Sequence, residues 1–216
     1  MAGILTNWNC AKMKRESMSD TDHESATLSE SPDRDARPVI LAFGNSLTAG
    51  AGVEPHRSYP AVLQRKIDAA GYRYRVVNAG ISGETSSEGL DRAPDFRDLR
   101  PAIVIVELGA NDGLRGMPIE ATRRNLGAIV SLFQSAGAKV ILAGMVVPPN
   151  YGLQYSEAFR KIFPEVAEQF GAARIPFFLE GVGGHPELNQ DDGLHPTADG
   201  YDLIVGNVWD VLKPML

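Results

Sequence analysis

Three side chains in this sequence have the types and the order of a nucleophile and its activating pair. Ser46 stands in a short polar turn directly after the apolar run 39–43 and Gly44. Asp192 and His195 stand together in Asp192-Gly-Leu-His195 near the other end of the chain. An aspartate that accepts from one ring nitrogen of histidine leaves the other nitrogen free to take a serine proton. This pattern favours Ser46 as nucleophile, His195 as general base and Asp192 as its orienting carboxylate.

Each of these residues also has an ordinary structural interpretation. Serine is a common helix N-cap, so Ser46 alone is equally consistent with a capping role. An isolated Asp-x-x-His is more often a capped turn with a surface histidine than a catalytic pair. The other motifs must decide between these interpretations.

Two further residues could donate hydrogen bonds to a developing oxyanion. Asn111 follows the strongest strand signal of the chain, and Gly83 follows the second strand. An asparagine there is often only a turn former, and a glycine often only supplies a positive φ. Together with the backbone N–H of Ser46, however, they give three donors on three loops, and such donors are a large part of acyl-transfer catalysis.

The elements that must position these residues alternate between strand and helix. Apolar and β-branched runs predict strands over 38–43, 72–78, 101–108, 139–145 and 174–178. Helical spacing predicts helices over 59–70, 87–91, 119–136, 156–170 and 197–212, with Pro164 expected to kink or divide the fourth. This alternation predicts a three-layer α/β domain with a five-stranded parallel sheet. Sites in such folds lie on the loops that follow the strands, and every candidate residue falls on one, including the long loop 179–196.

Length, composition and charge restrict the kinds of fold and partner expected for this protein. The chain has 216 residues, 44% of them hydrophobic and 22% charged, which suits one globular domain with a full core. The net charge is −6 without a basic block, so we expect no nucleic-acid partner and no anionic membrane as the main partner. No apolar run approaches the length of a membrane span, so no stable membrane insertion is expected. Cys10 is the only cysteine, which excludes an intrachain disulfide.

Residues 1–37 are expected to form a disordered N-terminal tail ahead of a domain over 38–216. Their apolar residues are sparse, so they cannot bury enough surface to offset the entropy of ordering. They also lack the apolar core of a secretory signal, which predicts a cytoplasmic protein.

Four blocks resemble, in their order, those of the SGNH (GDSL-type) hydrolases. They are Gly44-Asn-Ser-Leu47, Gly83, Gly109-Ala-Asn-Asp112 and Asp192-Gly-Leu-His195. Two longer stretches, 145–152 with Pro-Pro-Asn-Tyr-Gly and 190–196, resemble the bacterial multifunctional acyl-CoA thioesterase I / lysophospholipase L1 / arylesterase group. The resemblance covers about residues 38–216, everything except the tail.

The resemblance implies a flavodoxin-like three-layer α/β/α sandwich and a serine esterase/thioesterase. The implied substrates are small-molecule aryl or short-to-medium acyl esters, with acyl-CoA and lysophospholipid as further options, and no cofactor or metal is implied. A monomer or weak homo-oligomer is expected. Related thioesterases are commonly exported, in contrast to the cytoplasmic location predicted from the missing signal. Carried over by position, the resemblance implies a triad of Ser46, Asp192 and His195, an oxyanion hole of Ser46, Gly83 and Asn111, and acyl-site loops that contain Gly113, Leu114 and Pro149.

One residue departs from the family pattern. The usual aspartate before the serine is Asn45 here, which is isosteric but uncharged. That aspartate is not a triad member, so the chemistry is retained. A neutral Asn45 removes one stabiliser of protonated His195, which leads to the hypothesis that this enzyme tolerates lower pH than a homologue with aspartate.

Other functional classes remain as alternatives at this point. A metal hydrolase could use Asp191, Asp192, His185 and His195, but no HExxH or comparable ligand run occurs. The Gly-x-Ser-x-Gly elbow of α/β-hydrolases, a P-loop and a dinucleotide fingerprint after strand one are absent as well. The remaining alternative is a catalytically weak or inactive module that binds an acyl or glycan ligand, and Asn45 is the one feature that favours it.

Overall fold

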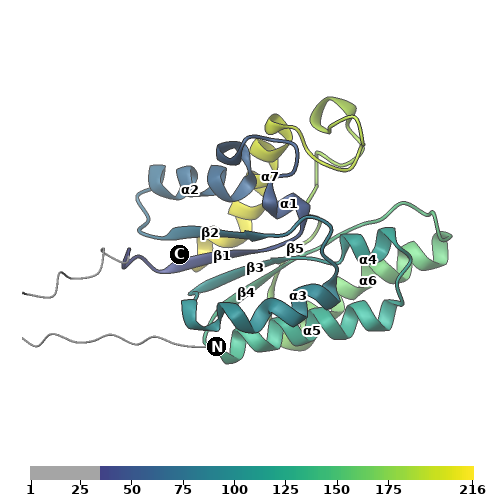
Figure 1. Cartoon of the computed structure of the whole chain (residues 1–216), viewed down its shortest axis with the longest axis horizontal. Coiled ribbons are helices and arrows are strands. Elements are labelled where there is room, and N and C mark those ends of the chain that lie inside the picture. The colour runs from purple at the N-terminus through teal and green to yellow at the C-terminus, as the bar shows by residue number, and fades with distance from the viewer. Residues whose placement is uncertain (1–34) are drawn as a thin grey trace, which may run out of the picture. The chain divides into compact units, whose positions relative to one another are not determined.

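The structure is a computed structural model that describes residues 35–216. The expected disordered tail lies outside the described residues except for 35–37, so the tail and the cytoplasmic location stay predictions. From Arg37 to Leu216 the chain forms one compact unit. A parallel sheet is covered by helices on both faces (Figure 1), as the sequence predicted.

The five strands are all parallel and lie in the order β2-β1-β3-β4-β5. Their bounds are β1 Val39–Gly44, β2 Arg75–Gly80, β3 Ile103–Glu107, β4 Lys139–Ala143 and β5 Ala173–Ile175. The strand order reverses between β1 and β3, which is where open α/β sheets place their ligands. Gly44 pairs with Gly80 on one side and Glu107 on the other, so these three strands end level at the same edge.

Two helices cover one face of the sheet and three others cover the opposite face (Figure 1). The first pair is α2 (Tyr59–Ala69) and α7 (Ala198–Leu212), and the second group is α3 (Ser86–Arg92), α5 (Ile119–Ser135) and α6 (Leu153–Phe170). The short helices α1 (Ser46–Ala49) and α4 (Ala110–Leu114) begin just after β1 and β3. Short 3-10 helices occupy Pro55–Arg57, Ala93–Leu99, Pro186–Leu188 and Lys213–Met215.

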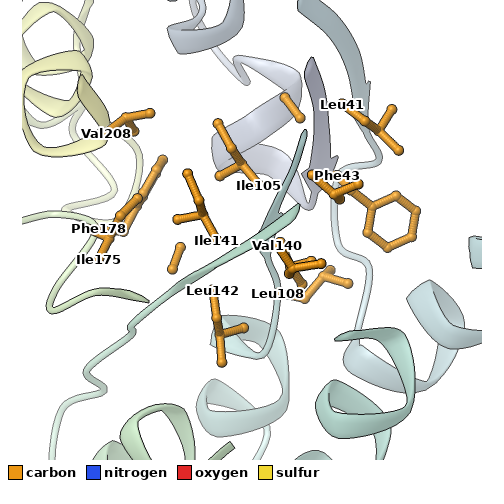
Figure 2. Packing of buried hydrophobic residues seen from close by; sticks show 14 of the residues in the cluster. Leu41, Phe43, Ile105, Leu108, Val140, Ile141, Leu142, Ile175, Phe178 and Val208 are labelled. Atoms are coloured by element: carbon orange, nitrogen blue, oxygen red, sulfur yellow. The ribbon is translucent and has the colours of Figure 1, made fainter. Parts of the chain in front are cut away.

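The core lies on both faces of the sheet because successive strand residues point to opposite sides. Figure 2 shows Ile105, Ile141 and Phe178 on the side of Val208 from α7. On the opposite face Phe43 meets the ring of Phe133 from α5 edge-on, with 5.3 Å between centroids. All these side chains are fully buried, which fits the continuous apolar runs that predicted a sheet covered on both faces.

Several bounds differ from the sequence prediction by up to three residues: β2 begins at Arg75 instead of residue 72, and β4 ends at Ala143 instead of residue 145. The differences in β5 and α6 involve prolines. The fifth strand ends at Ile175 instead of residue 178 because Pro176 has no N–H to extend the ladder. The chain then turns, and the N–H of Phe178 donates to the carbonyl of Gly144 at 2.8 Å. Pro164 does not divide α6, which runs unbroken from 153 to 170 with its apolar face buried on both sides of the proline.

Candidate active site

Ser46 is the first residue of α1, at the carboxyl end of β1. Asn45 caps this helix, since its side-chain oxygen accepts from the N–H of Leu47 at 3.0 Å. The turn lies directly on β3, and a Cβ on Gly44 would overlap the backbone carbonyl of Glu107 and the hydroxyl of Thr48. Only glycine at position 44 therefore lets β1 turn into α1 against its neighbour.

The three predicted triad residues meet in one chain of hydrogen bonds. Ser46 Oγ lies 2.8 Å from Nε2 of His195, although the two residues are 149 positions apart. Nδ1 of the same ring lies 2.6 Å from Oδ2 of Asp192. The arrangement matches that of a nucleophile, a base and its orienting carboxylate.

Asp192 is held by the backbone as well as by the imidazole. Its Oδ1 accepts from the N–H groups of Leu194 at 2.9 Å and His195 at 3.0 Å. The hydrogen bond from the His195 side chain, followed by those two backbone bonds, lowers the pKa of Asp192 to about 2. The carboxylate is therefore ionised at neutral pH, and it can stabilise an imidazolium formed during attack.

The long loop that contains His195 is closed at its base. Asn189 and Pro196 form an antiparallel bridge, and the N–H of Gln190 donates to the carbonyl of His195 at 2.7 Å. The Gln190 amide also donates to the carbonyl of Ala51 at 2.8 Å, just beyond α1. Gln190 thereby ties the histidine loop to the serine turn.

Donors for an oxyanion are present on the three predicted loops. Within residues 35–216 the N–H groups of Ser46 and Gly83 donate to no protein acceptor. Gly83 has φ +82°, a conformation that a residue with a side chain rarely adopts. Nδ2 of Asn111 donates to the carbonyl of Glu84 at 2.9 Å, which leaves its second hydrogen available.

These groups open into a cavity of about 260 Å³ whose remaining wall is mainly apolar. Ser46, Gly83, Asn111 and His195 line one end. The apolar lining consists of Leu47, Ala51, Ala110, Leu114, Met145, Val146, Val147, Pro148, Leu179 and Leu194.

Of the three residues expected on acyl-site loops, Leu114 lines this cavity. Gly113 lies buried behind the wall, where it faces Val147 and Phe159. Pro149 is not among the lining residues, whereas its neighbour Pro148 is, because the chain leaves the cavity at that point.

Comparison with known proteins agrees with this geometry. The model of the GDSL-like Lipase/Acylhydrolase family matches residues 42–203, from β1 into α7. The chain belongs to this family.

Individual relatives of this GDSL-like acylhydrolase match over most of their length. Esterase TesA of Pseudomonas aeruginosa is 44% identical over 182 residues, which are 84% of this chain and 90% of that protein. Thioesterase 1/protease 1/lysophospholipase L1 of Escherichia coli K12 is 38% identical over 84% of this chain and 86% of its own. The crystal structure of TesA matches with a TM-score of 0.80 at 45% identity, covering 82% of this chain and 99% of that one.

In this acylhydrolase a largely buried ion pair supports the loop that contains Gly83. Glu84, whose carbonyl accepts from Asn111, pairs through its side chain with Arg92. Arg92 also donates to the carbonyls of Gly44 at 3.2 Å and Ala79 at 2.8 Å, and it stacks on Phe43. One guanidinium therefore ties the loop to the ends of β1 and β2. Sequence reasoning missed this pair, because a Glu and an Arg eight residues apart on a polar stretch give no distinctive signal.

The carboxylate of Asp112 anchors α4 to neighbouring helices through hydrogen bonds. This carboxylate accepts from the backbone N–H of Ser86 at 2.8 Å. It also accepts from the hydroxyls of Ser86 and Thr122 and is 2% exposed. Asp112 thus joins α4 to α3 and α5.

A second residue missed by sequence reasoning lies directly under the nucleophile. Glu107, at the end of β3, is fully buried and is contacted by the Asn45 amide at 2.9 Å, the Asn45 N–H at 3.3 Å and the Thr48 hydroxyl at 2.7 Å. Burial raises its pKa to about 8. The available signal was an acidic residue inside the continuous apolar run 103–108. Asn45 therefore faces Glu107 with its amide nitrogen, while its oxygen lies 3.5 Å from Ser46 Oγ.

The two histidines considered for a metal site each contact a different carboxylate. His195 is engaged by Ser46 and Asp192, while His185 lies 3.5 Å from Glu187 in an exposed turn. Across residues 35–216 no group of three or more His, Cys, Asp or Glu side chains is arranged to hold a metal ion. In the same part of the chain, no helix combines the length and the apolar character needed to cross a bilayer.

Proposed function

We propose that this serine esterase/thioesterase hydrolyses carboxylic esters and thioesters through an acyl-enzyme on Ser46. The observation that carries the proposal is the chain of hydrogen bonds from Asp192 through His195 to Ser46, which ends at an apolar cavity. A positioned nucleophile, a base and unpaired donors in one cavity are the requirements of acyl transfer.

The first half of the reaction forms the acyl-enzyme. Nε2 of His195 takes the Ser46 proton as Oγ attacks the acyl carbonyl, and Asp192 stabilises the resulting imidazolium. The oxyanion accepts from the N–H groups of Ser46 and Gly83 and from Asn111. The imidazolium then donates its proton to the leaving alcohol or thiol as the bond to the acyl carbon breaks.

Water completes the cycle. His195 removes a proton from a water molecule, which attacks the acyl carbon, and the same groups donate hydrogen bonds to the second oxyanion. The proton returns to Ser46 Oγ as the carboxylic acid is released. The side chains on this route need no cofactor.

The wall of the cavity supports an acyl substrate. Its lining is apolar apart from the catalytic groups, Asn45 and Ser82, so it suits a hydrocarbon chain and offers few partners to a polar one. The E. coli relative is named as a thioesterase and a lysophospholipase. We extend this substrate class, aryl and short-to-medium acyl esters with acyl-CoA and lysophospholipid, to the present enzyme.

Hydrolysis of p-nitrophenyl esters from C2 to C12 with EDTA present tests the proposal. Ser46→Ala should lower kcat by about 10⁴- to 10⁶-fold without a change in thermal unfolding. Ser87→Ala is the matched control, because Ser87 is exposed on α3 and away from the cavity lining. Equal activity of Ser46→Ala and wild type would refute the acyl-enzyme. Absence of turnover by the wild type on every ester would return the weight to an acyl- or glycan-binding module.

A further inference from the structure

A second cavity, of about 470 Å³, lies beside the catalytic one and differs from it in charge. Its lining combines apolar and charged side chains, namely Val146, Arg160, Lys161, Pro164, Arg174, Pro176, Phe177 and Glu180. Three cations face one carboxylate there, on a chain whose net charge is −6. A local excess of positive charge on an acidic protein attracts anions.

The cations of this cavity are not neutralised by the protein. Arg160 and Lys161 are exposed on α6, and neither side chain makes a hydrogen bond or ion pair within residues 35–216. Arg174 donates to the carbonyl of Pro176 at 3.3 Å, which occupies one of its five donors. Within the same residues no Lys or Arg nitrogen lies within 4.0 Å of Glu180. Most of the donors in this cavity are therefore available to a ligand.

The two cavities adjoin. Val146, in the loop after β4, lines both of them. After β5, two consecutive residues line different cavities: Leu179 lines the catalytic cavity and Glu180 lines the basic one. A substrate held at Ser46 can therefore extend over Val146 into the basic cavity. The acyl chain has no charge to place there, so an anion in this cavity must belong to the leaving-group part of the substrate.

We propose that this basic cavity binds a phosphate group on the leaving-group part of the substrate; the inference rests on the proposed function. Phosphate oxygens accept several hydrogen bonds at once, and an arginine fork with a neighbouring ammonium matches that geometry. Two kinds of leaving group have this chemistry: the phosphates of coenzyme A and the phosphate of a lysophospholipid.

The test removes the two exposed charges and compares matched substrates. Arg160→Gln/Lys161→Gln is measured against Arg97→Gln/Arg100→Gln, which removes two cations from another surface cavity of about 460 Å³. Octanoyl-CoA is paired with octanoyl-pantetheine, and octanoyl-lysophosphatidate with monooctanoylglycerol; the second of each pair lacks phosphate. Hydrolysis of p-nitrophenyl octanoate by each variant reports on the catalytic machinery alone.

We expect Arg160→Gln/Lys161→Gln to raise KM for a phosphate-bearing substrate roughly five- to twentyfold with kcat retained. The effect should shrink in 0.5 M NaCl and be absent for the phosphate-free partners. An effect on octanoyl-CoA identifies coenzyme A as the source of the phosphate, and an effect on the lysophosphatidate identifies the lipid headgroup.

Three results would overturn the inference while p-nitrophenyl octanoate is still hydrolysed. They are an unchanged KM for both phosphate-bearing substrates, an equal effect of the control variant, and an equal effect on the phosphate-free partners. The inference would also be overturned if the wild type hydrolysed neither of the two phosphate-bearing substrates. Loss of p-nitrophenyl octanoate hydrolysis by the wild type would instead remove the proposed function itself.

Discussion

The buried carboxyl of Glu107 gives the sharpest test of the electrostatics beneath the nucleophile. Glu107→Gln keeps the shape of the side chain and removes its ability to ionise. The Asn45 amide and N–H can only donate to it, whereas the Thr48 hydroxyl can also accept. A glutamine keeps two of these three hydrogen bonds, because its oxygen accepts from the Asn45 amide and its Nε2 donates to Thr48. The Asn45 N–H loses Oε2 as an acceptor but still donates to the backbone carbonyl of Glu107 at 3.2 Å. The substitution should leave the turn at Ser46 intact.

The magnitude follows from the pKa of Glu107, which burial raises from 4.5 to about 8. Between these two values the folded protein binds a proton that the unfolded chain has released. The free energy of unfolding therefore falls as pH rises through this window. A difference of this size corresponds to roughly 5 kcal/mol once the carboxyl is ionised in both states, because each pH unit is about 1.4 kcal/mol. Glu107→Gln removes this loss, so the variant should gain on wild type between pH 5 and pH 9.

Urea unfolding at pH 5, 7 and 9 measures the effect. Near pH 5 the two proteins should have similar stability, and by pH 9 Glu107→Gln should be the more stable by several kcal/mol. Glu168→Gln, on the exposed side of α6, is the matched control and should show no such trend. A constant difference between Glu107→Gln and wild type from pH 5 to pH 9 would refute the reasoning, since Glu107 would then titrate alike in both states.

Four further predictions concern the catalytic groups and Asn45. Asp192→Asn should lower kcat about 10⁴-fold on p-nitrophenyl butyrate. Because the pKa of Asp192 is about 2, wild-type kcat/KM should fall on the acid side with the slope of a single protonation, that of His195; a slope of two would contradict this. Asn111→Ala should lower kcat by about 10²- to 10³-fold with KM for the same ester nearly unchanged, and a loss confined to KM would remove Asn111 from the oxyanion hole. Asn45→Asp places a carboxylate near Ser46 and His195, so the acid limb of the pH–rate profile should move to higher pH; a limb that stays in place would reject the hypothesis of acid tolerance.

The sheet could be predicted from local patterns, and the meeting of Ser46, Asp192 and His195 from the placing of their motifs on loops that follow strands. The runs at 39–43 and 101–108 are apolar throughout, and such runs belong to strands buried on both faces. Parallel strands end at a common edge, so residues that follow different strands, such as Ser46 and Asn111, had to lie near each other. The turn Asp192-Gly-Leu-His195 is short enough to bring its carboxylate back to its own imidazole, which is what the structure contains.

The support beneath the site could not be predicted, because it depends on contacts between distant segments. Arg92 meets carbonyls at the ends of two strands, and Gln190 meets Ala51 across 139 positions. A long polar side chain can reach many partners, and the choice among them follows from the packed structure. The residues that line the acyl cavity could not be predicted for the same reason. Adjacent prolines occupy the loop at 148–149, and only the path of the chain decides that Pro148 faces the cavity.

Asn45 shows how the two kinds of residue act together. Read as part of a motif, it is a departure at a position that does not take part in the chemistry. In the structure its amide nitrogen contacts Glu107 and its oxygen caps the nucleophile helix, so one uncharged side chain satisfies a buried carboxyl and a helix terminus. An aspartate at the same place would offer Glu107 a second acceptor in place of a donor, and one proton would have to be retained between the two carboxyls. With asparagine at position 45 no proton has to be shared between two carboxyls. Glu107 is then the group beneath Ser46 whose ionisation changes with pH.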